Sequence, residues 1–318
     1  MTFASSVAIA LAAAIAIYGA SVVFVNAIEW VGRRLRLGET ATGAILAALG
    51  TALPETMITL VAVLTGGGRT GDIGIGTALG GPLALSTAGY GIFALTKGRS
   101  GQTNGDGFST SDRSRLVSDQ MWFLAMFGAQ LLLGLVIFPG KRWTAIGFLI
   151  AYGVYVWRTT RSGSAAPAKA PPALFLAPGS QRPSLVIALV QTGCALAVLA
   201  IASHFFVDEL ERLGTALSLD QQATGLLLSP LATELPEVLN TILWVRRGKA
   251  KMALANISGA MLVQTAMPAA LGLGFTSWRL TLGPIIAGIV TMTATLLVLA
   301  VIRHGGLAPP ISSTARSE

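Results

Sequence analysis

Residues 48–60 read ALGTALPETMITL and place a proline and a glutamate, Pro54 and Glu55, inside a long apolar stretch. Proline lacks the N–H group that a helix interior needs, and a carboxylate in hydrocarbon costs at least ~2.5 kcal/mol. If the stretch spans a membrane, both residues lie near mid-depth, where an ionisable group indicates a function. The alternative is that Glu55 sits at a helix end, solvated or snorkelling.

The composition favours the membrane interpretation. Of the 318 residues 53% are hydrophobic and 11% are charged, and the mean hydropathy is +0.69. A helix needs roughly 20 apolar residues to cross a bilayer, so we predict an all-α polytopic membrane protein with nine transmembrane helices. They are expected near residues 4–28, 41–65, 72–96, 118–138, 142–158, 184–207, 221–245, 251–275 and 280–302.

The basic residues predict how the chain lies in the membrane. The net charge is +8, but the Lys and Arg residues are dispersed among short loops, which argues against nucleic acid as a partner. If the N-terminus is outside, most of the 22 Lys and Arg residues lie inside. The positive-inside rule thus favours an external N-terminus and a cytoplasmic C-terminus in a multi-pass protein of the inner (plasma) membrane.

An internal duplication sets the topology. Residues 24–55 align without a gap with residues 206–237, including the Thr-Gly and Leu-Pro-Glu runs. The first copy holds five helices, an odd number, so the second copy enters the membrane from the opposite side, as in many secondary transporters. We predict a first repeat over 1–160, a flexible cytoplasmic linker rich in Pro, Ala and Ser over 161–183, a second repeat over 184–303 that lacks a fifth helix, and a cytoplasmic tail over 304–318.

A second polar loop, residues 97–115, contains Asp106 and Asp112. A calcium-binding loop is one interpretation, but the ligand spacing of an EF-hand and its closing glutamate are absent. A structural connector is the favoured interpretation.

The two Pro-Glu pairs predict a cation site. Pro54 frees backbone carbonyls near residues 48–51, and Thr51 and Glu55 add a hydroxyl and a carboxylate. The second copy supplies Thr233 and Glu237 beside Pro236. If the duplication brings the two kinks face to face, the repeat interface offers an all-oxygen environment, which Na⁺ and Ca²⁺ prefer.

These segments resemble the alpha repeats of the sodium/calcium exchanger family, within the calcium/cation antiporter superfamily. The matching runs are GTALPE at 50–55 with DIGIGTALGGP at 72–82, and ATELPE at 232–237 with ALANISGAML at 253–262. The resemblance implies a bacterial-type exchanger with ion ligands at Glu55, Glu237, Thr51, Thr233 and Asn256. It also implies that Gly76, Gly80 and Gly259 allow close helix packing, and that Asp72 has either an N-cap or a direct role.

The sequence departs from the family pattern at several ligand positions. Ala52 and Glu234 stand where the family has serine, and Thr77 stands where it has asparagine. Gly81-Pro82 and Ala260-Met261 replace Ser-Asn pairs. We include Thr77 and Glu234 among the candidate metal ligands. Glu234 shares a helix face with Glu237, so it either confers proton coupling or a changed ion stoichiometry, or it points to water in a vestibule.

The expected function is secondary active antiport of a cation, Ca²⁺ first, against Na⁺ or H⁺ by alternating access. The expected partners are small cations and the lipid bilayer; no cofactor and no obligatory protein partner are implied. A degenerate, non-transporting or regulatory family member is the alternative, because the tenth helix of the family is missing. An enzyme is disfavoured because His204 and His304 lie outside any hydrolase motif. Gln130 is assigned to helix packing, and Gln264 either to packing or to the periphery of the site.

Overall fold

The computed structural model describes residues 2–34, 39–65, 69–99, 109–162, 172–180, 183–246 and 248–304, and these are almost entirely helical. The first half contains α1 (Phe3–Arg34), α2 (Glu39–Thr65), α3 (Arg69–Ala84), the π-helical turn η1 (Leu85–Gly89), α4 (Tyr90–Arg99), α5 (Thr110–Leu135), the 3₁₀ turn η2 (Lys141–Trp143) and α6 (Thr144–Ser162). The second half contains α7 (Leu185–Ala216), α8 (Gln221–Thr233), α9 (Leu235–Arg246), α10 (Ala250–Phe275) and α11 (Leu282–Arg303).

Each of the nine expected spans falls on a helix or on a run of consecutive helices. The third span is the run α3–η1–α4, and the seventh is the pair α8–α9. Within the described ranges, six helical spans are long and apolar enough to cross a membrane, and a shorter apolar helix covers Ala52–Thr65. The protein is therefore a multi-pass membrane protein, as the composition predicts.

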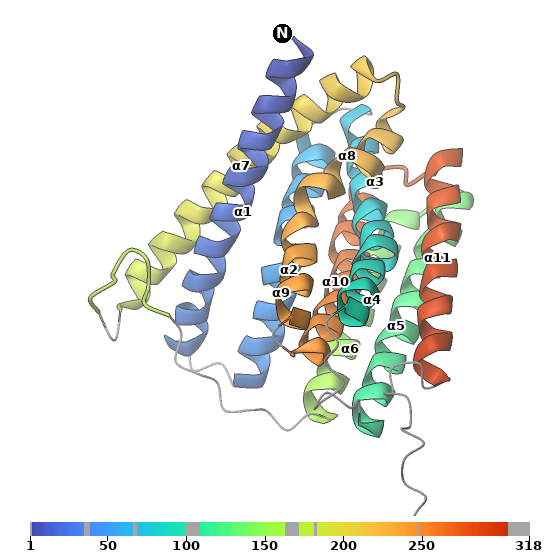
Figure 1. Ribbon diagram of the computed structural model, residues 1–318. Helices are drawn as coiled ribbons and strands as arrows, with labels where there is room; N and C mark the ends of the chain where they lie inside the picture. Colours follow the sequence, from blue (N-terminus) through green and yellow to red (C-terminus); the bar gives the residue numbers. More distant parts are fainter. Residues whose placement is uncertain are drawn as a thin grey trace, which may run out of the picture.

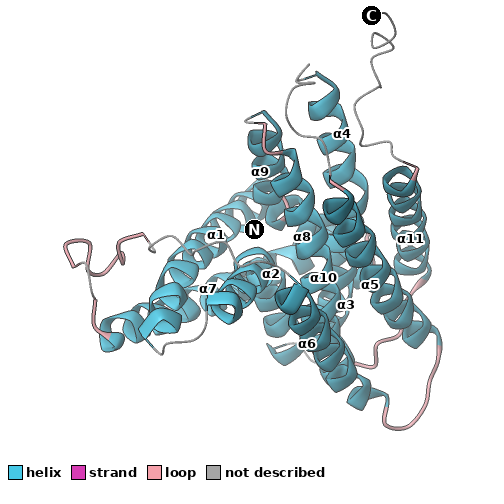
Figure 2. Ribbon diagram, turned by 90° about the horizontal axis from the view of Figure 1, so that it is seen from below, coloured by secondary structure: helices cyan, strands magenta, loops and turns pink. Residues whose placement is uncertain are grey.

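The two halves are arranged as inverted repeats. In Figure 1, α1 runs downward from the marked N-terminus and α7 runs upward beside it. Two further helix pairs join the halves: α3 packs along α8, and α2 packs against α10. Figure 2 shows α1 and α7 at one side of the bundle and α11 at its opposite edge.

Burial separates a central helix from peripheral ones. In the 18-residue apolar segment of α10, 78% of the residues are buried inside the protein. The corresponding share is 33% in α1, 28% in α7 and 33% in α11. Small and polar residues along α10 allow neighbours to approach closely, which drives packing where lipid supplies no hydrophobic force. The core of the protein thus surrounds α10, and α1, α7 and α11 present exposed apolar faces.

Glycines allow α3 and α8 to cross at close range. A methyl group on Gly76 would overlap the carbonyl group of Gln222, and one on Gly225 would overlap that of Ile73. At Gly80 a Cβ atom would lie 2.6 Å from both the carbonyl oxygen of Leu226 and Cγ of Pro230. The close-packing role expected of Gly76 and Gly80 fits this crossing. A Cβ atom on Gly259 would meet no described atom within 4 Å. The side chains of residues 39–51 of α2 are outside the described part of the structure. The close-packing role expected of Gly259 therefore stays a prediction.

The expectation of a wholly flexible linker over 161–183 is wrong for its described part. Residues up to Ser162 complete α6. Residues 172–180 form a compact turn, closed by an antiparallel bridge between Leu174 and Ala177. The turn is hydrogen-bonded to the side chains of Asn26 in α1 and Gln191 in α7. These long-range contacts order a segment whose composition is that of a flexible linker.

Of the two acidic residues in the loop at 97–115, Asp112 is described, and its contacts fit the structural connector. Asp112 forms a capping box with Ser109 at the start of α5 and pairs with Lys251 at 2.8 Å. Asp106 lies outside the described residues. Asp72, in the first turn of α3, accepts a hydrogen bond from Gln222 of α8 at 3.1 Å, so here it fastens one helix start to the neighbouring helix.

Candidate cation site

The candidate site lies where four membrane segments meet. Helix α2 supplies Glu55, the α8–α9 junction supplies Thr233, Glu234 and Glu237, α3 supplies Thr77, and α10 supplies Asn256 and Gln264. These segments belong to both repeats and pack against one another. The duplication therefore brings together residues that are more than two hundred positions apart in the sequence, such as Glu55 and Gln264.

The two Pro-Glu motifs differ in backbone structure. Helix α2 continues through Pro54, whereas α8 ends at Thr233 and α9 begins at Leu235, with Glu234 between them. The second repeat carries an additional proline, Pro230, one turn before the break. Two prolines six residues apart remove two N–H donors from one stretch, which explains why only the second motif is interrupted.

The interruption exposes backbone acceptors. The amide of Glu234 donates to the carbonyl of Pro230 at 2.9 Å, and the amide of Val238 donates to that of Glu234 at 3.1 Å. The carbonyls of Leu231, Ala232 and Thr233 receive no such bond from the residues four positions ahead. Free carbonyl oxygens beside a carboxylate are hard ligands of the kind that line ion sites in interrupted membrane helices.

Three carboxylates are buried at this junction. Glu55 and Glu234 are each 2% exposed, and Glu237 is 8% exposed. Glu234 interacts electrostatically with both of the other glutamates, and the side chains of Thr233 and Glu234 lie beside Glu55. Buried carboxylates this close repel one another unless a cation or a proton compensates them. This burial argues against solvated side chains at Glu55 and Glu237, and their depth in the membrane stays a prediction.

Three oxygens of Glu55 and Glu234 have no described donor. Neither oxygen of Glu55, and only one of Glu234, has a hydrogen-bond partner among the described residues. The one donor is Gln264, whose Nε2 lies 2.7 Å from Oε1 of Glu234. Burying unpaired acceptors is costly, so such a group in a native protein calls for a bound species.

Gln264 is thus part of the site and not only of the packing. It is 1% exposed on α10, and its own Oε1 has no described partner. The sequence left its role open because an isolated amide in an apolar helix fits both packing and ligation. Gln130, by contrast, lies on α5, where its backbone carbonyl accepts a bond from the indole of Trp278 at 2.9 Å. Neither polar atom of its buried side chain has a described partner, so its assignment to packing stays a prediction.

Gly81 makes room for the additional carboxylate. A Cβ atom at this position would lie 2.8 Å from Oε1 of Glu234 and 2.8 Å from Oε1 of Gln264. The bonded pair of side chains therefore lies directly against the backbone of α3, where the family pattern has a serine. Glu234 faces this protein interior, which excludes the alternative of a side chain pointing into a water-filled vestibule in this conformation.

The remaining candidate ligands lie on helices that pack at this centre. Thr77 is 1% exposed and its hydroxyl lacks a described partner, whereas the hydroxyl of Thr233 donates to the carbonyl of Ser229 at 3.2 Å. Asn256 is half-buried and its Nδ2 is unpaired among described residues. Thr51 lies in α2, but its side chain is outside the described part.

Two hydroxyl groups near the motifs were not expected. Thr59 lies one helical turn after Glu55, and Ser229 lies one turn before Thr233; both are fully buried, and neither Oγ donates to a described acceptor. A spacing of four residues from each motif is the signal that would have identified them.

The carboxylates do not form a ready-made metal centre. Among the residues that the structure describes, no three His, Cys, Asp or Glu side chains converge closely enough to hold a metal ion. Full coordination therefore requires carbonyl, hydroxyl and amide oxygens, or a conformation in which the carboxylates approach further.

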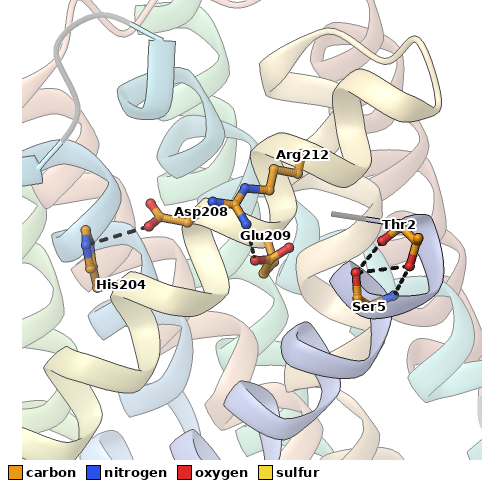
Figure 3. Close-up of polar contacts among 6 residues, drawn as sticks. All are labelled: Thr2, Ser5, His204, Asp208, Glu209 and Arg212. Atoms are coloured by element: carbon orange, nitrogen blue, oxygen red, sulfur yellow. Dashed lines mark hydrogen bonds and ion pairs between the residues drawn. The ribbon is translucent and has the colours of Figure 1, made fainter.

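The histidine His204 pairs with a residue of its own helix. Figure 3 shows it on α7 with Nε2 at 3.7 Å from the carboxylate of Asp208, while Arg212 pairs with Glu209 at 2.7 Å on the same helix. Both members of the His204–Asp208 pair are about half exposed. These contacts lie within one helix and join residues three or four positions apart.

The fold and the site define a polytopic membrane protein built from inverted repeats around a buried acidic centre. The model of the family described as sodium/calcium exchanger protein matches residues 5–161 and 187–311. The chain therefore belongs to the sodium/calcium exchanger protein family, as the paired motifs predict.

Relatives and solved structures agree with this assignment. The chain is 25% identical over 224 residues to the inner membrane protein YrbG of Escherichia coli K12, an alignment that covers 69% of this chain and 64% of that protein. The fold is similar to that of the H⁺/Ca²⁺ exchanger CAX, with a TM-score of 0.74, 17% identity and coverage of 94% of this chain and 77% of the other. The sodium-calcium exchanger NCX_Mj gives a TM-score of 0.55 at 21% identity, covering 95% and 92%.

Proposed function

We propose that the protein is a secondary active antiporter that exchanges Ca²⁺ for Na⁺ or H⁺. The observation that carries this proposal is the buried trio Glu55, Glu234 and Glu237 at a helix interruption between two inverted repeats, in which both oxygens of Glu55 and one of Glu234 lack a described hydrogen-bond partner. A permanently empty site of this kind is destabilising, whereas a site that cations enter and leave is neutralised on each passage.

The ligand chemistry favours a hard cation. Ca²⁺ takes six to eight oxygen ligands at flexible distances, so it tolerates a mixed set of carboxylates, carbonyls and amides. We assign Glu55, Glu237, Glu234, Thr51, Thr233, Thr77 and Asn256 to that set and add Gln264. The names of the two structurally similar exchangers, one H⁺/Ca²⁺ and one sodium-calcium, support the same class of substrate.

Glu234 sets the counter-ion in this proposal. It adds a carboxylate where the family pattern has a serine, and it removes a hydroxyl ligand that a sodium ion would use. Two neighbouring carboxylates surround it, so the return step carries either a proton or one sodium ion fewer. Gln264 donates to one oxygen and leaves the other available to the ion.

Alternating access in this proposal uses the peripheral pair of helices. The α1–α7 pair presents exposed apolar faces to lipid and packs against the α2 side of the site, so it is placed to slide when the carboxylates are neutralised. We place the protein in the inner membrane with the N-terminus outside and the C-terminus in the cytoplasm, on the distribution of basic residues.

The test is ⁴⁵Ca²⁺ uptake into proteoliposomes under an outward Na⁺ gradient and, separately, an outward H⁺ gradient. Glu55→Gln and Glu237→Gln are expected to abolish uptake, and Glu211→Gln, which removes a carboxylate from the end of α7, is expected to retain it. Glu234→Ser is expected to change which gradient drives uptake. Uptake that survives both Glu55→Gln and Glu237→Gln would refute the assigned site.

A non-transporting family member remains the second candidate. Two observations favour it: the Ser-Asn pairs of the family pattern are replaced in both repeats, and no described set of carboxylates is preassembled for a metal ion. Absence of flux under both gradients, together with Ca²⁺-dependent thermal stabilisation that Glu55→Gln abolishes, would identify a cation-binding protein that does not transport.

A further inference from the structure

Residues 172–180 form a short loop that packs on the ends of α1 and α7. Leu174 is fully buried in a small cluster with Ala27, Trp30, Val31 and Ala188. Figure 1 shows the loop beside the lower ends of these two helices, and Figure 2 shows it projecting from the edge of the bundle. The loop therefore adds to the outer surface of the α1–α7 pair.

Side chains of the two helices satisfy the polar backbone groups of this loop. From α1, the indole of Trp30 donates to the carbonyl of Pro172 at 2.9 Å, and Nδ2 of Asn26 donates to that of Ala173 at 3.2 Å. The amide of Phe175 donates to Oδ1 of Asn26 at 3.2 Å, and the amide of Leu176 donates to Oε1 of Gln191 at 2.9 Å.

The two amide side chains are also bonded to each other. Nε2 of Gln191, on α7, donates to Oδ1 of Asn26, on α1, at 3.0 Å, and to the carbonyl of Val23 at 3.0 Å. A loop in water needs no such partners, because water satisfies its backbone. A loop outside water must have them, since each unsatisfied group costs several kcal/mol in hydrocarbon.

The depth of the contacts places the loop inside the apolar zone. Gln191 lies six residues into α7, roughly 9 Å along its axis from Leu185 at 1.5 Å per residue. On the same turns Val186, Leu189 and Val190 are 68%, 50% and 51% exposed. Apolar side chains exposed from the first turn onward indicate that lipid already surrounds α7 where it binds the loop.

The tip of the loop continues this apolar surface. Phe175 is 56% exposed and Leu176 is 57% exposed, although neighbouring Leu174 is fully buried. Their amides are the two that α1 and α7 fix by side-chain bonds, so the helices hold these apolar side chains outward. A surface of this kind, held at the margin of a bilayer, fits the boundary between headgroups and acyl chains.

We propose that residues 172–180 are an interfacial membrane anchor: Phe175 and Leu176 insert among lipid acyl chains while Asn26, Trp30 and Gln191 bind the loop backbone to α1 and α7. The partner is the lipid bilayer itself, and no transported ion enters the argument. Because the anchor is attached to both helices of the peripheral pair, it fixes their level in the membrane as one unit.

The test measures the surroundings of the loop tip in proteoliposomes. The single native cysteine is replaced by Cys194→Ser, and Phe175→Cys is labelled with an environment-sensitive nitrobenzoxadiazole fluorophore. Quenching by shallow spin-labelled phosphatidylcholine is compared with quenching by aqueous iodide. Val190→Cys, on the exposed face of α7, is the lipid-facing reference. Thr215→Cys is the aqueous reference, because α7 is about 48 Å long and outlasts a ~30 Å hydrocarbon core.

We expect spin-labelled lipid to quench the Phe175 label about as strongly as the Val190 label. We also expect the iodide quenching constant of the Phe175 label to be several-fold below that of the Thr215 label. Iodide quenching equal to that at Thr215 would overturn the proposal, since the tip would then lie in water. Protection from both quenchers would overturn it as well, because the tip would then be covered by protein, such as a second copy of the chain.

Discussion

Replacing Gly80 by alanine tests whether the close crossing of α3 and α8 positions the site. The added Cβ atom would lie 2.6 Å from the carbonyl oxygen of Leu226 and from Cγ of Pro230. Ordinary contact requires ~3.5 Å, so the two helices must separate locally by about 0.9 Å. Overpacking of this kind costs about 1–3 kcal/mol, because a proline ring and a backbone carbonyl cannot rotate away.

Gly91→Ala, in α4 of the same membrane span, is the matched control. No atom lies within 4 Å of the Cβ atom it would introduce. Both variants gain the same helical advantage of alanine over glycine, about 0.5–1 kcal/mol, so that contribution cancels in the comparison. The difference between the two variants therefore reports the crossing alone, about 1–3 kcal/mol.

The assay is thermal unfolding of the purified protein in detergent, followed by tryptophan fluorescence. We expect Gly80→Ala to unfold at a lower temperature than the parent protein and Gly91→Ala at the same or a higher one. Because α8 carries Thr233 and leads into Glu234, Gly80→Ala should also reduce ⁴⁵Ca²⁺ uptake. Equal unfolding temperatures for the two variants would refute the close crossing.

Three further predictions concern the site and the loop. In Gly81→Ala the three atoms nearest to the new Cβ atom belong to the side-chain ends of Glu234 and Gln264, so we expect a near-normal unfolding temperature and roughly tenfold weaker apparent affinity for Ca²⁺ in uptake assays, ~1.4 kcal/mol. Gln264→Met leaves Glu234 without its donor at a cost of about 1–3 kcal/mol without cations; Ca²⁺ should then raise its unfolding temperature more than that of the parent, and an equal rise would contradict the assignment. Leu174→Ala empties a fully buried position and should release the loop, seen as faster proteolytic cleavage within residues 172–180. Gly179→Ala, whose Cβ atom would meet no atom within 4 Å, should be cleaved at the parental rate.

The general architecture follows from patterns that are local or periodic. Apolar runs of transmembrane length predict the nine spans, and one gapless duplication with an odd number of helices predicts the inverted repeats. The burial of Glu55 and Glu237 follows from their depth in those runs. Each of these inferences uses only neighbouring residues or a repeat of the same chain.

Features that depend on distant partners could not be predicted in this way. The bond from Gln264 to Glu234 joins two helices, and nothing near either residue indicates it. The loop at 172–180 has the composition of a flexible linker, but its bonds come from Asn26 and Gln191. The continuous helix at Pro54 and the broken one at Pro236 share a motif, and the difference becomes clear only when Pro230 is considered together with the tertiary packing.

The glycine at position 81 and the glutamate at position 234, which both replace serine in the family pattern, have one steric explanation. A serine side chain at position 81 would occupy the space that Oε1 of Glu234 and Oε1 of Gln264 fill, since even a Cβ atom would lie 2.8 Å from each. The glycine at 81 and the glutamate at 234 are therefore compatible with each other, whereas serine at 81 is incompatible with this glutamate in its present position. The same glycine-rich face of α3 that lets α8 approach also receives the additional carboxylate. One surface of α3 thus allows the close helix crossing and also receives the carboxylate that we assign to the proposed ion site, so two of the departures from the family motifs, Gly81 and Glu234, depend on each other.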